Sequence, residues 1–218
     1  YFGYLTWYKG ADFLIKSLAS QKEIAGKKIR LIMAGGDSVT QKTKSHYRDF
    51  IDLVYRLAKK SPQITITGFV PEEDILKYYS AADLVILPYR TMISSSGPLS
   101  FAAGFSKPFI LSSPLKGYLE SLDFCSLLRE VGLKKEDIIF SLNKKKLVEK
   151  IMSVMQPKKI ILLSKFASLL AEKRNFSVLA PKYAQVLDHN EDCVLIPVSS
   201  KKIISGNFAC NNLESLAQ

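Results

Sequence analysis

The chain has 218 residues, nearly half of them hydrophobic and under a quarter charged, which is enough for one large globular domain but short for two full ones. This composition excludes a disordered chain, and no apolar run approaches the ~20 residues that a membrane-spanning helix needs. The formal net charge is +11, which raises the question of an anionic partner.

Strand and helix patterns alternate from the first residue to about residue 190. Apolar side chains recur at helical spacing in some stretches, while others are short apolar runs that end at Gly or Pro. In chain order we expect strands over 1–5, 29–34, 64–67, 84–87, 108–111 and 137–140, and helices over 9–20, 45–60, 71–82, 97–105, 144–155, 160–173 and 177–189. Residues 190–218 are mostly polar, and we expect a tail or appendage there.

The alternation of strands and helices predicts parallel βαβ units in a doubly wound, Rossmann-like α/β sheet. We place this domain at residues 1–189. Ligands of such sheets bind beyond the carboxyl ends of the strands. The loops at 6–9, 35–43, 68–71 and 88–97 each follow a predicted strand, so they are expected to share one rim.

The loop before the predicted helix at 97–105 has the features of an anion site. Ser95, Ser96 and Gly97 lead directly into Pro98 and Leu99. A helix start offers unpaired amides to a diphosphate, and glycine lets the ligand approach the backbone. Alternatively, these serines only cap their own helix.

Basic and glycine residues elsewhere on this rim could serve the same ligand. Arg90 follows the strand at 84–87 and could donate to a phosphate, or could be an ordinary surface arginine. Lys9 and Gly10 begin the first predicted helix after Gly3, where the ammonium would lie over the rim; taken alone, this signal is weak.

A second glycine segment follows the strand at 64–67. The backbone of Gly68, Phe69 and Val70 could hydrogen-bond a base edge, although a simple turn explains the same residues. Three of the four acids of the rim fall at 72–74, where acids favour the start of a helix. We therefore expect no acid–base pair there.

The remaining titratable residues and the basic charge predict little specific chemistry. Three cysteines and two histidines show no zinc or redox spacing, so we expect reduced thiols and no metal site. The lysines fall in scattered pairs without an RNA-binding motif. A solvated surface is the favoured explanation, contact with an anionic membrane comes second, and no nucleic-acid partner is expected. Because residues 1–5 lack the layout of a secretion signal, we expect a cytoplasmic protein, with attachment to the cytoplasmic face of a membrane left open.

Several segments together resemble the C-terminal domain of the retaining GT-B glycosyltransferases of family GT4, the glycosyl transferases group 1. The matching stretches are Phe2–Leu5 with Lys9-Gly10, Leu31–Gly35, Ile66–Val70, Ser80–Arg90, Ser96–Leu99 and Lys107–Ile110. The spacing from Ala82-Asp83 through Pro88 to Lys107-Pro108 is the most specific of these signals. The resemblance covers about residues 1–188.

The resemblance implies a nucleoside-diphosphate sugar as the substrate and no further cofactor. Lys9 would pair with the diphosphate, the amides of 96–99 would hold its distal phosphate, and 68–70 would meet the base. Lys9 and Arg90, with the start of the helix at 97, would stabilise the departing nucleoside diphosphate without a metal. In the family, a separate N-terminal domain binds the acceptor, and we expect a glycan or lipid-linked acceptor.

This sequence departs from the family pattern at three positions. Tyr4 stands where an arginine usually follows the first glycine. Ile93 and Phe101 stand where many members carry a pair of glutamates, so the chain is similar to a subgroup without that pair.

Three hypotheses follow. The first is a hexose-transferring enzyme half that lacks its acceptor domain, and the second is a non-catalytic nucleotide-sugar-binding or partner module. The third, a dehydrogenase-like nucleotide binder, is disfavoured because no Gly-x-Gly-x-x-Gly follows the first predicted strand.

Overall fold

The computed structural model describes residues 1–188. The chain divides into two compact units, Tyr1–Glu172 and Lys173–Gln218. In the second unit, the described residues include helix α9 (Phe176–Asp188). The predicted tail, residues 190–218, lies outside the described residues and stays a prediction.

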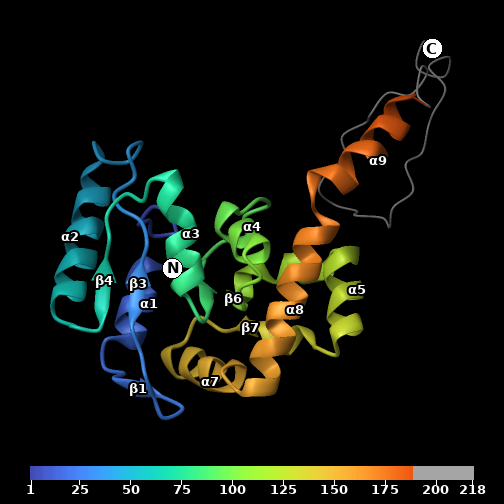
Figure 1. Ribbon diagram of the computed structural model, residues 1–218. Helices are drawn as coiled ribbons and strands as arrows, with labels where there is room; N and C mark the ends of the chain where they lie inside the picture. Colours follow the sequence, from blue (N-terminus) through green and yellow to red (C-terminus); the bar gives the residue numbers. More distant parts are fainter. Residues whose placement is uncertain (189–218) are drawn as a thin grey trace, which may run out of the picture. The chain divides into compact units, whose positions relative to one another are not determined.

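The first unit alternates strands and helices for most of its length (Figure 1). Its strands are β1 (Glu23–Ile24), β2 (Lys27–Lys28), β3 (Leu31–Met33), β4 (Ile64–Ile66), β5 (Val85–Leu87), β6 (Phe109–Ser112) and β7 (Ile139–Phe140). Its helices are α1 (Ala11–Leu18), α2 (Ser45–Lys59), α3 (Glu72–Ala81), α4 (Gly97–Gly104), the 3₁₀ helix η1 (Ser113–Glu120), α5 (Leu122–Val131), α6 (Lys135–Ile138), α7 (Lys144–Val154) and α8 (Pro157–Lys173).

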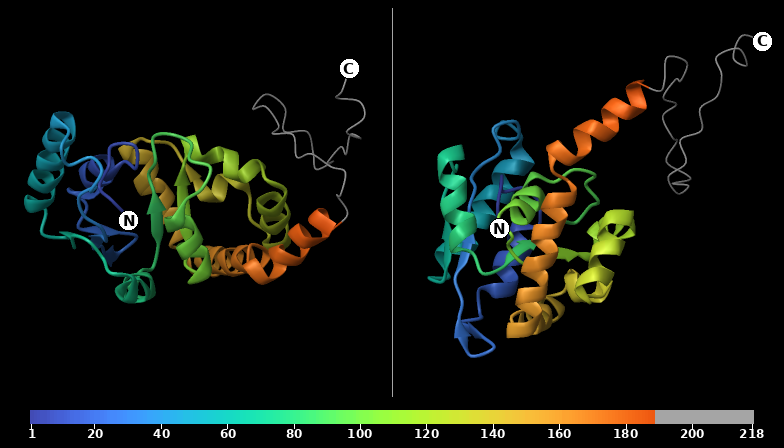
Figure 2. Two further views of the ribbon diagram at one scale, coloured as in Figure 1. Left: turned by 90° about the horizontal axis from the view of Figure 1, so that it is seen from above. Right: turned by 45° about the vertical axis from the view of Figure 1, so that its right-hand side comes forward.

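The strands of the α/β core pair in parallel, as predicted. β3 pairs with β4 in the register Leu31 to Ile64, and β5, β6 and β7 form a three-stranded sheet in that order. The start of the chain lies between β3 and β5 in Figures 1 and 2. The predicted strand at 1–5 is wrong in extent, because it is reduced to one parallel pairing of Phe2 with Ala34.

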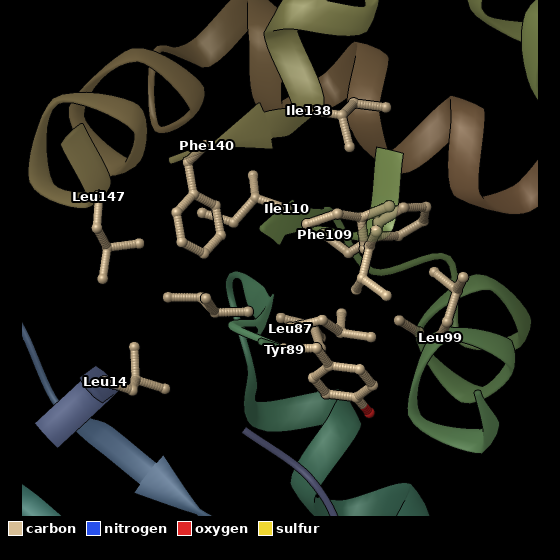
Figure 3. Packing of buried hydrophobic residues seen from close by; sticks show 14 of the residues in the cluster. Leu14, Leu87, Tyr89, Leu99, Phe109, Ile110, Ile138, Phe140 and Leu147 are labelled. Atoms are coloured by element: carbon tan, nitrogen blue, oxygen red, sulfur yellow. The ribbon is translucent and has the colours of Figure 1, made fainter. Parts of the chain in front are cut away.

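The core is built where the helices cover these strands. All four residues of β6 are buried, which explains why the first three of them are apolar. Figure 3 shows Leu87 and Tyr89 close to Phe109 and Ile110 of the neighbouring strand. The Phe109 ring also packs against Phe166 of α8, with 5.8 Å between ring centroids. Each fully buried side chain of this size contributes about 1.5–3 kcal/mol relative to an exposed one.

Three parts of the first unit differ from the sequence-based expectations. The hairpin β1–β2 was not predicted, because its strands have two residues each and leave no periodic signal. Helix α5 and η1 fill the stretch 113–131, for which we predicted no element. The predicted strand at 137–140 begins only at Ile139, because the residues before it form helix α6, whose start Asp137 caps by accepting a hydrogen bond from the Lys134 backbone N–H (2.8 Å).

Candidate functional site

Three loops meet at the carboxyl ends of β3 and β4. The Gly3 backbone N–H donates to the Ala34 carbonyl and the Leu5 N–H donates to the Gly36 carbonyl, each at 2.9 Å. The Gly35 N–H donates to Thr67 Oγ1 at 3.1 Å. Two main-chain hydrogen bonds and one bond to a threonine side chain therefore join the segments 3–5, 34–36 and Thr67.

Glycines make this close approach possible. A Cβ atom at Gly35 would lie 2.0 Å from the Gly3 carbonyl oxygen. A Cβ at Gly36 would lie 2.9 Å from the Phe69 backbone nitrogen. No larger residue fits at Gly35 without moving the main chain. The Gly35-Gly36 pair was not among the predicted site residues, although two glycines directly after a buried strand are a recognisable signal.

A pocket of about 380 Å³ opens between these loops and the start of helix α4. Five of the predicted site residues line it, namely Gly3, Lys9, Phe69, Val70 and Pro98. The structure adds residues that the prediction missed, among them Phe2, Gly35, Gly36, Glu72 and Ile75. The structure thus brings together predicted residues from four separate segments of the chain.

The Lys9 ammonium lies at the centre of this arrangement. A Cβ built at Gly3 would lie 2.8 Å from Lys9 Nζ and 3.8 Å from Pro98 Cγ, so the ammonium and the start of α4 face the same point. Burial lowers the pKa of Lys9 below its usual value. Among residues 1–188 no carboxylate forms an ion pair with Lys9. A half-buried cation without a counter-ion can stabilise an anionic ligand.

The start of helix α4 offers fewer free donors than the sequence suggested. Ser96 Oγ accepts a hydrogen bond from the Leu99 N–H at 3.4 Å, so this serine caps its own helix. Pro98 has no N–H. The Gly97 N–H has no partner among residues 1–188, and Gly97 and Ser95 are exposed. Of the predicted donors at residues 97–99, the Gly97 N–H is the one that remains free for an anion.

Arg90 has other partners. Its guanidinium forms a two-pronged ion pair with Asp12 of α1, at 2.8 Å and 3.1 Å. It does not line the pocket beside Lys9. Its contact with a diphosphate stays a prediction. In the structure the guanidinium is paired with Asp12 instead.

Two predicted glycines have backbone roles. Gly10 precedes α1 with a positive φ of 71°, and a Cβ there would lie 2.0 Å from the Pro88 carbonyl oxygen. Gly68 also has a positive φ, 78°, and leads into Phe69, whose side chain is 72% exposed. Gly10 is required for packing against the β5–α4 loop, while Gly68 turns the chain so that Phe69 reaches the pocket.

The positions that depart from the family pattern are apolar or aromatic. Phe101 lines the pocket and packs against Phe2 and Tyr79, with 5.8 Å between centroids in each case. Tyr79 in turn donates a hydrogen bond from its hydroxyl to the Pro98 carbonyl (3.1 Å). Ile93 packs partly buried against the core. An aromatic cluster of Phe2, Tyr79 and Phe101 therefore supports this wall of the pocket.

A second cavity, of about 460 Å³, lies between β3 and β5. It is larger, but neither Lys9 nor the start of α4 lines it. Its walls include side chains from both strand groups, such as Leu31, Ile32, Val85 and Ile86. We place the candidate site at the smaller pocket because Lys9, which has no counter-ion among residues 1–188, lies there beside Pro98 at the start of α4.

Among residues 1–188, no three His, Cys, Asp or Glu side chains gather in a way that could hold a metal ion. No helix within the same range has the length and apolar character needed to cross a membrane.

The family model and the solved structures that resemble this chain both point to glycosyltransferases. The family model described as "Glycosyl transferases group 1" matches residues 1–126. A search of curated proteins finds no match. Among solved structures, HepE from Anabaena in complex with UDP is similar with a TM-score of 0.63 and 16% identity, over 86% of this chain and 47% of that one.

Two further solved structures are similar to this chain. Sucrose-phosphate synthase from Thermosynechococcus elongatus is similar with a TM-score of 0.62 and 17% identity, over 86% of this chain and 44% of that one. The C-terminal domain of a glycosyl transferase group 1 family protein from Francisella tularensis matches with a TM-score of 0.53 and 16% identity, over 84% of this chain and 83% of that domain. This chain therefore spans less than half the length of HepE and the synthase and has the fold of one domain.

Proposed function

The chain belongs to the glycosyl transferases group 1 family, and from this we propose that it is the donor-binding domain of a glycosyltransferase, holding a nucleoside-diphosphate sugar by its diphosphate. The observation that carries the proposal is the Lys9 ammonium, half-buried, unpaired within residues 1–188, and facing Gly3 and Pro98. HepE, which shares the fold, has been crystallised with UDP and with UDP-glucose.

In this proposal the diphosphate lies between Lys9 and the amide of Gly97. The ammonium and the positive end of the α4 dipole stabilise the charge that develops as the nucleoside diphosphate departs. Phe69 and Val70, which line the same pocket, contact the nucleoside. Transfer of a hexose with retention, to a glycan or lipid-linked acceptor held by a further domain, completes the proposed reaction.

Titration calorimetry with UDP, GDP and ADP tests the proposal. We expect at least one of the three to bind, and Lys9→Met to weaken that binding by about 1.5–3 kcal/mol, roughly ten- to hundredfold in Kd. Lys59→Met, which removes an exposed ammonium from the last turn of α2, is the matched control and should leave Kd unchanged. The proposal fails if none of the nucleotides binds at millimolar concentration, or if the two lysine variants behave alike.

A second candidate is a binding module without catalytic activity. Phe101 and Ile93 favour it, because neither side chain can supply the carboxylate that many relatives have at these positions. If the chain is such a module, we expect it to bind a nucleotide but to transfer no sugar, even when an acceptor-binding half is added. Sugar transfer from UDP-glucose in that mixture, followed by mass spectrometry, would exclude this candidate.

A further inference from the structure

Arg90 contacts the loop that carries Lys9 at the residues just before Lys9. Its Nη1 donates to the Trp7 carbonyl at 2.5 Å, and its backbone N–H donates to the Tyr8 carbonyl at 2.7 Å. The guanidinium also lies over the Trp7 ring, 4.9 Å from the centroid. These contacts fix the main chain of the two residues directly before Lys9.

The same guanidinium holds the C-terminal side of that loop through Asp12. Nη1 lies 2.8 Å from Oδ1 and Nη2 lies 3.1 Å from Oδ2, which is the planar, two-pronged geometry that arginine forms with a carboxylate. Asp12 belongs to the first turn of α1, where the helix dipole favours a negative charge. Arg90 therefore bridges both flanks of Lys9.

Asp12 is more deeply buried than its partner, with the whole residue 6% exposed. Burial on its own would raise the pKa of this carboxyl, but the hydrogen bonds and charge of Arg90, together with Lys16, outweigh it and the pKa lies below its usual value. Lys16 contacts the same carboxylate at 3.3 Å from a side chain that is about half exposed. Arg90 is thus the principal partner of a charge that is costly to leave unpaired.

We propose that Asp12 is a positioning residue: it holds Arg90, and through Arg90 the loop from Trp7 to Gly10, so that the Lys9 ammonium stays beside Gly3. Arg90 then serves the donor site as a clamp and not by touching the diphosphate. The placement of Lys9 is a property of this chain by itself. Only the consequence for nucleotide binding rests on the proposed function.

The first test measures the position of Lys9 without any ligand. In Asp12→Asn, which keeps the shape and removes the charge, the loop loosens and the Lys9 ammonium gains water. Its pKa, followed by NMR on lysine-labelled protein, should rise towards the ordinary lysine value. Lys16→Met is the control, because it removes the other cation of Asp12 and leaves Arg90 in place, so the pKa of Lys9 should not move.

A second variant guards against a general loss of structure. Arg90→Lys keeps the positive charge but cannot bridge both Asp12 oxygens and the Trp7 carbonyl at once. It should shift the pKa of Lys9 in the same direction as Asp12→Asn. If the pKa of Lys9 and the amide signals of residues 7–10 stay unchanged in both folded variants, the clamp does not exist.

The second test separates a clamp from a direct phosphate contact, by calorimetry with UDP. A clamp predicts that Asp12→Asn lowers the affinity for UDP about tenfold, because a displaced Lys9 ammonium loses much of its charged contact with the diphosphate. The double variant Asp12→Asn with Arg90→Lys should lose no more affinity for UDP than either single variant. If Arg90 contacted the diphosphate, its release from Asp12 would maintain or raise affinity, which would overturn the proposal. Absence of UDP, GDP and ADP binding by the unchanged chain would refute the proposed function, while the NMR measurement would still decide the clamp.

Discussion

Replacement of Gly10 by alanine should destabilise the first unit far more than the same replacement at Gly26. Both glycines have nearly the same positive φ, 71° and 72°, so both variants bear the same backbone strain of about 1–2 kcal/mol. They differ in surroundings, because a Cβ at Gly10 would lie 2.0 Å from the Pro88 carbonyl oxygen, while a Cβ at Gly26 meets nothing within 4 Å.

The difference between the two variants isolates the backbone contact. Forcing an extra carbon into a closely packed position costs about 1–3 kcal/mol, so Gly10→Ala should lower the free energy of unfolding by roughly that much more than Gly26→Ala. Urea unfolding followed by circular dichroism measures both values. If the two variants agree within about 0.5 kcal/mol, Gly10 is present for its conformation only, and the close packing of α1 on the β5–α4 loop is refuted.

Two further predictions concern the caps and charges around the site. Ser96→Ala removes the side-chain cap of α4 and should cost about 1 kcal/mol in urea unfolding, whereas Ser95→Ala, at an exposed serine one position earlier, should cost little; equal losses would contradict the capping geometry. Because the pKa of Asp12 is lowered on folding, its contribution to stability is present above the unfolded value of about 3.9 and is lost as the pH falls through the folded value. Asp12→Asn should therefore show a shallower loss of unfolding free energy below about pH 4 than the unchanged chain, and parallel curves for the two proteins would count against this ion pair.

The longer helices of the first unit were predictable because they bury one stripe of side chains. In α2 the buried residues Tyr47, Ile51, Val54 and Ala58 recur at intervals of three and four, and the helix ends within one residue of the expected position. The central strands were predictable for a related reason. Burial on both faces makes β5 and β6 continuous apolar runs.

Short and singly paired segments were less predictable. The stretch 1–5 has the composition of a strand, yet it forms one isolated bridge at Phe2 and a few main-chain hydrogen bonds instead of a regular strand, and pairing depends on a neighbour that composition does not reveal. Residues 113–131 contain apolar side chains at helical spacing in α5, including Phe124, Leu127, Leu128 and Val131, but the preceding 3₁₀ turn obscures where the pattern starts.

The candidate site was likewise predictable in part. Lys9, Gly3, Pro98 and the 68–70 loop could be assigned to one rim, because parallel strands place the loops that follow them at the same edge. The free donors at α4 could not be counted, because the choice between a serine that caps its helix and one that leaves the amides free depends on a side-chain rotamer.

By itself, the sequence determined the parallel α/β architecture and predicted the rim of the candidate site, because periodicity and loop position are local properties of the chain. The family followed from the resemblance of its motifs. Only the tertiary structure decided the partners of the charged groups. Arg90 and Asp12 are 78 positions apart, and no local pattern indicates that they meet. Folding pairs Arg90 with a buried carboxylate and leaves Lys9 without a counter-ion in the described residues, since the stability of a charge depends on what surrounds it in space.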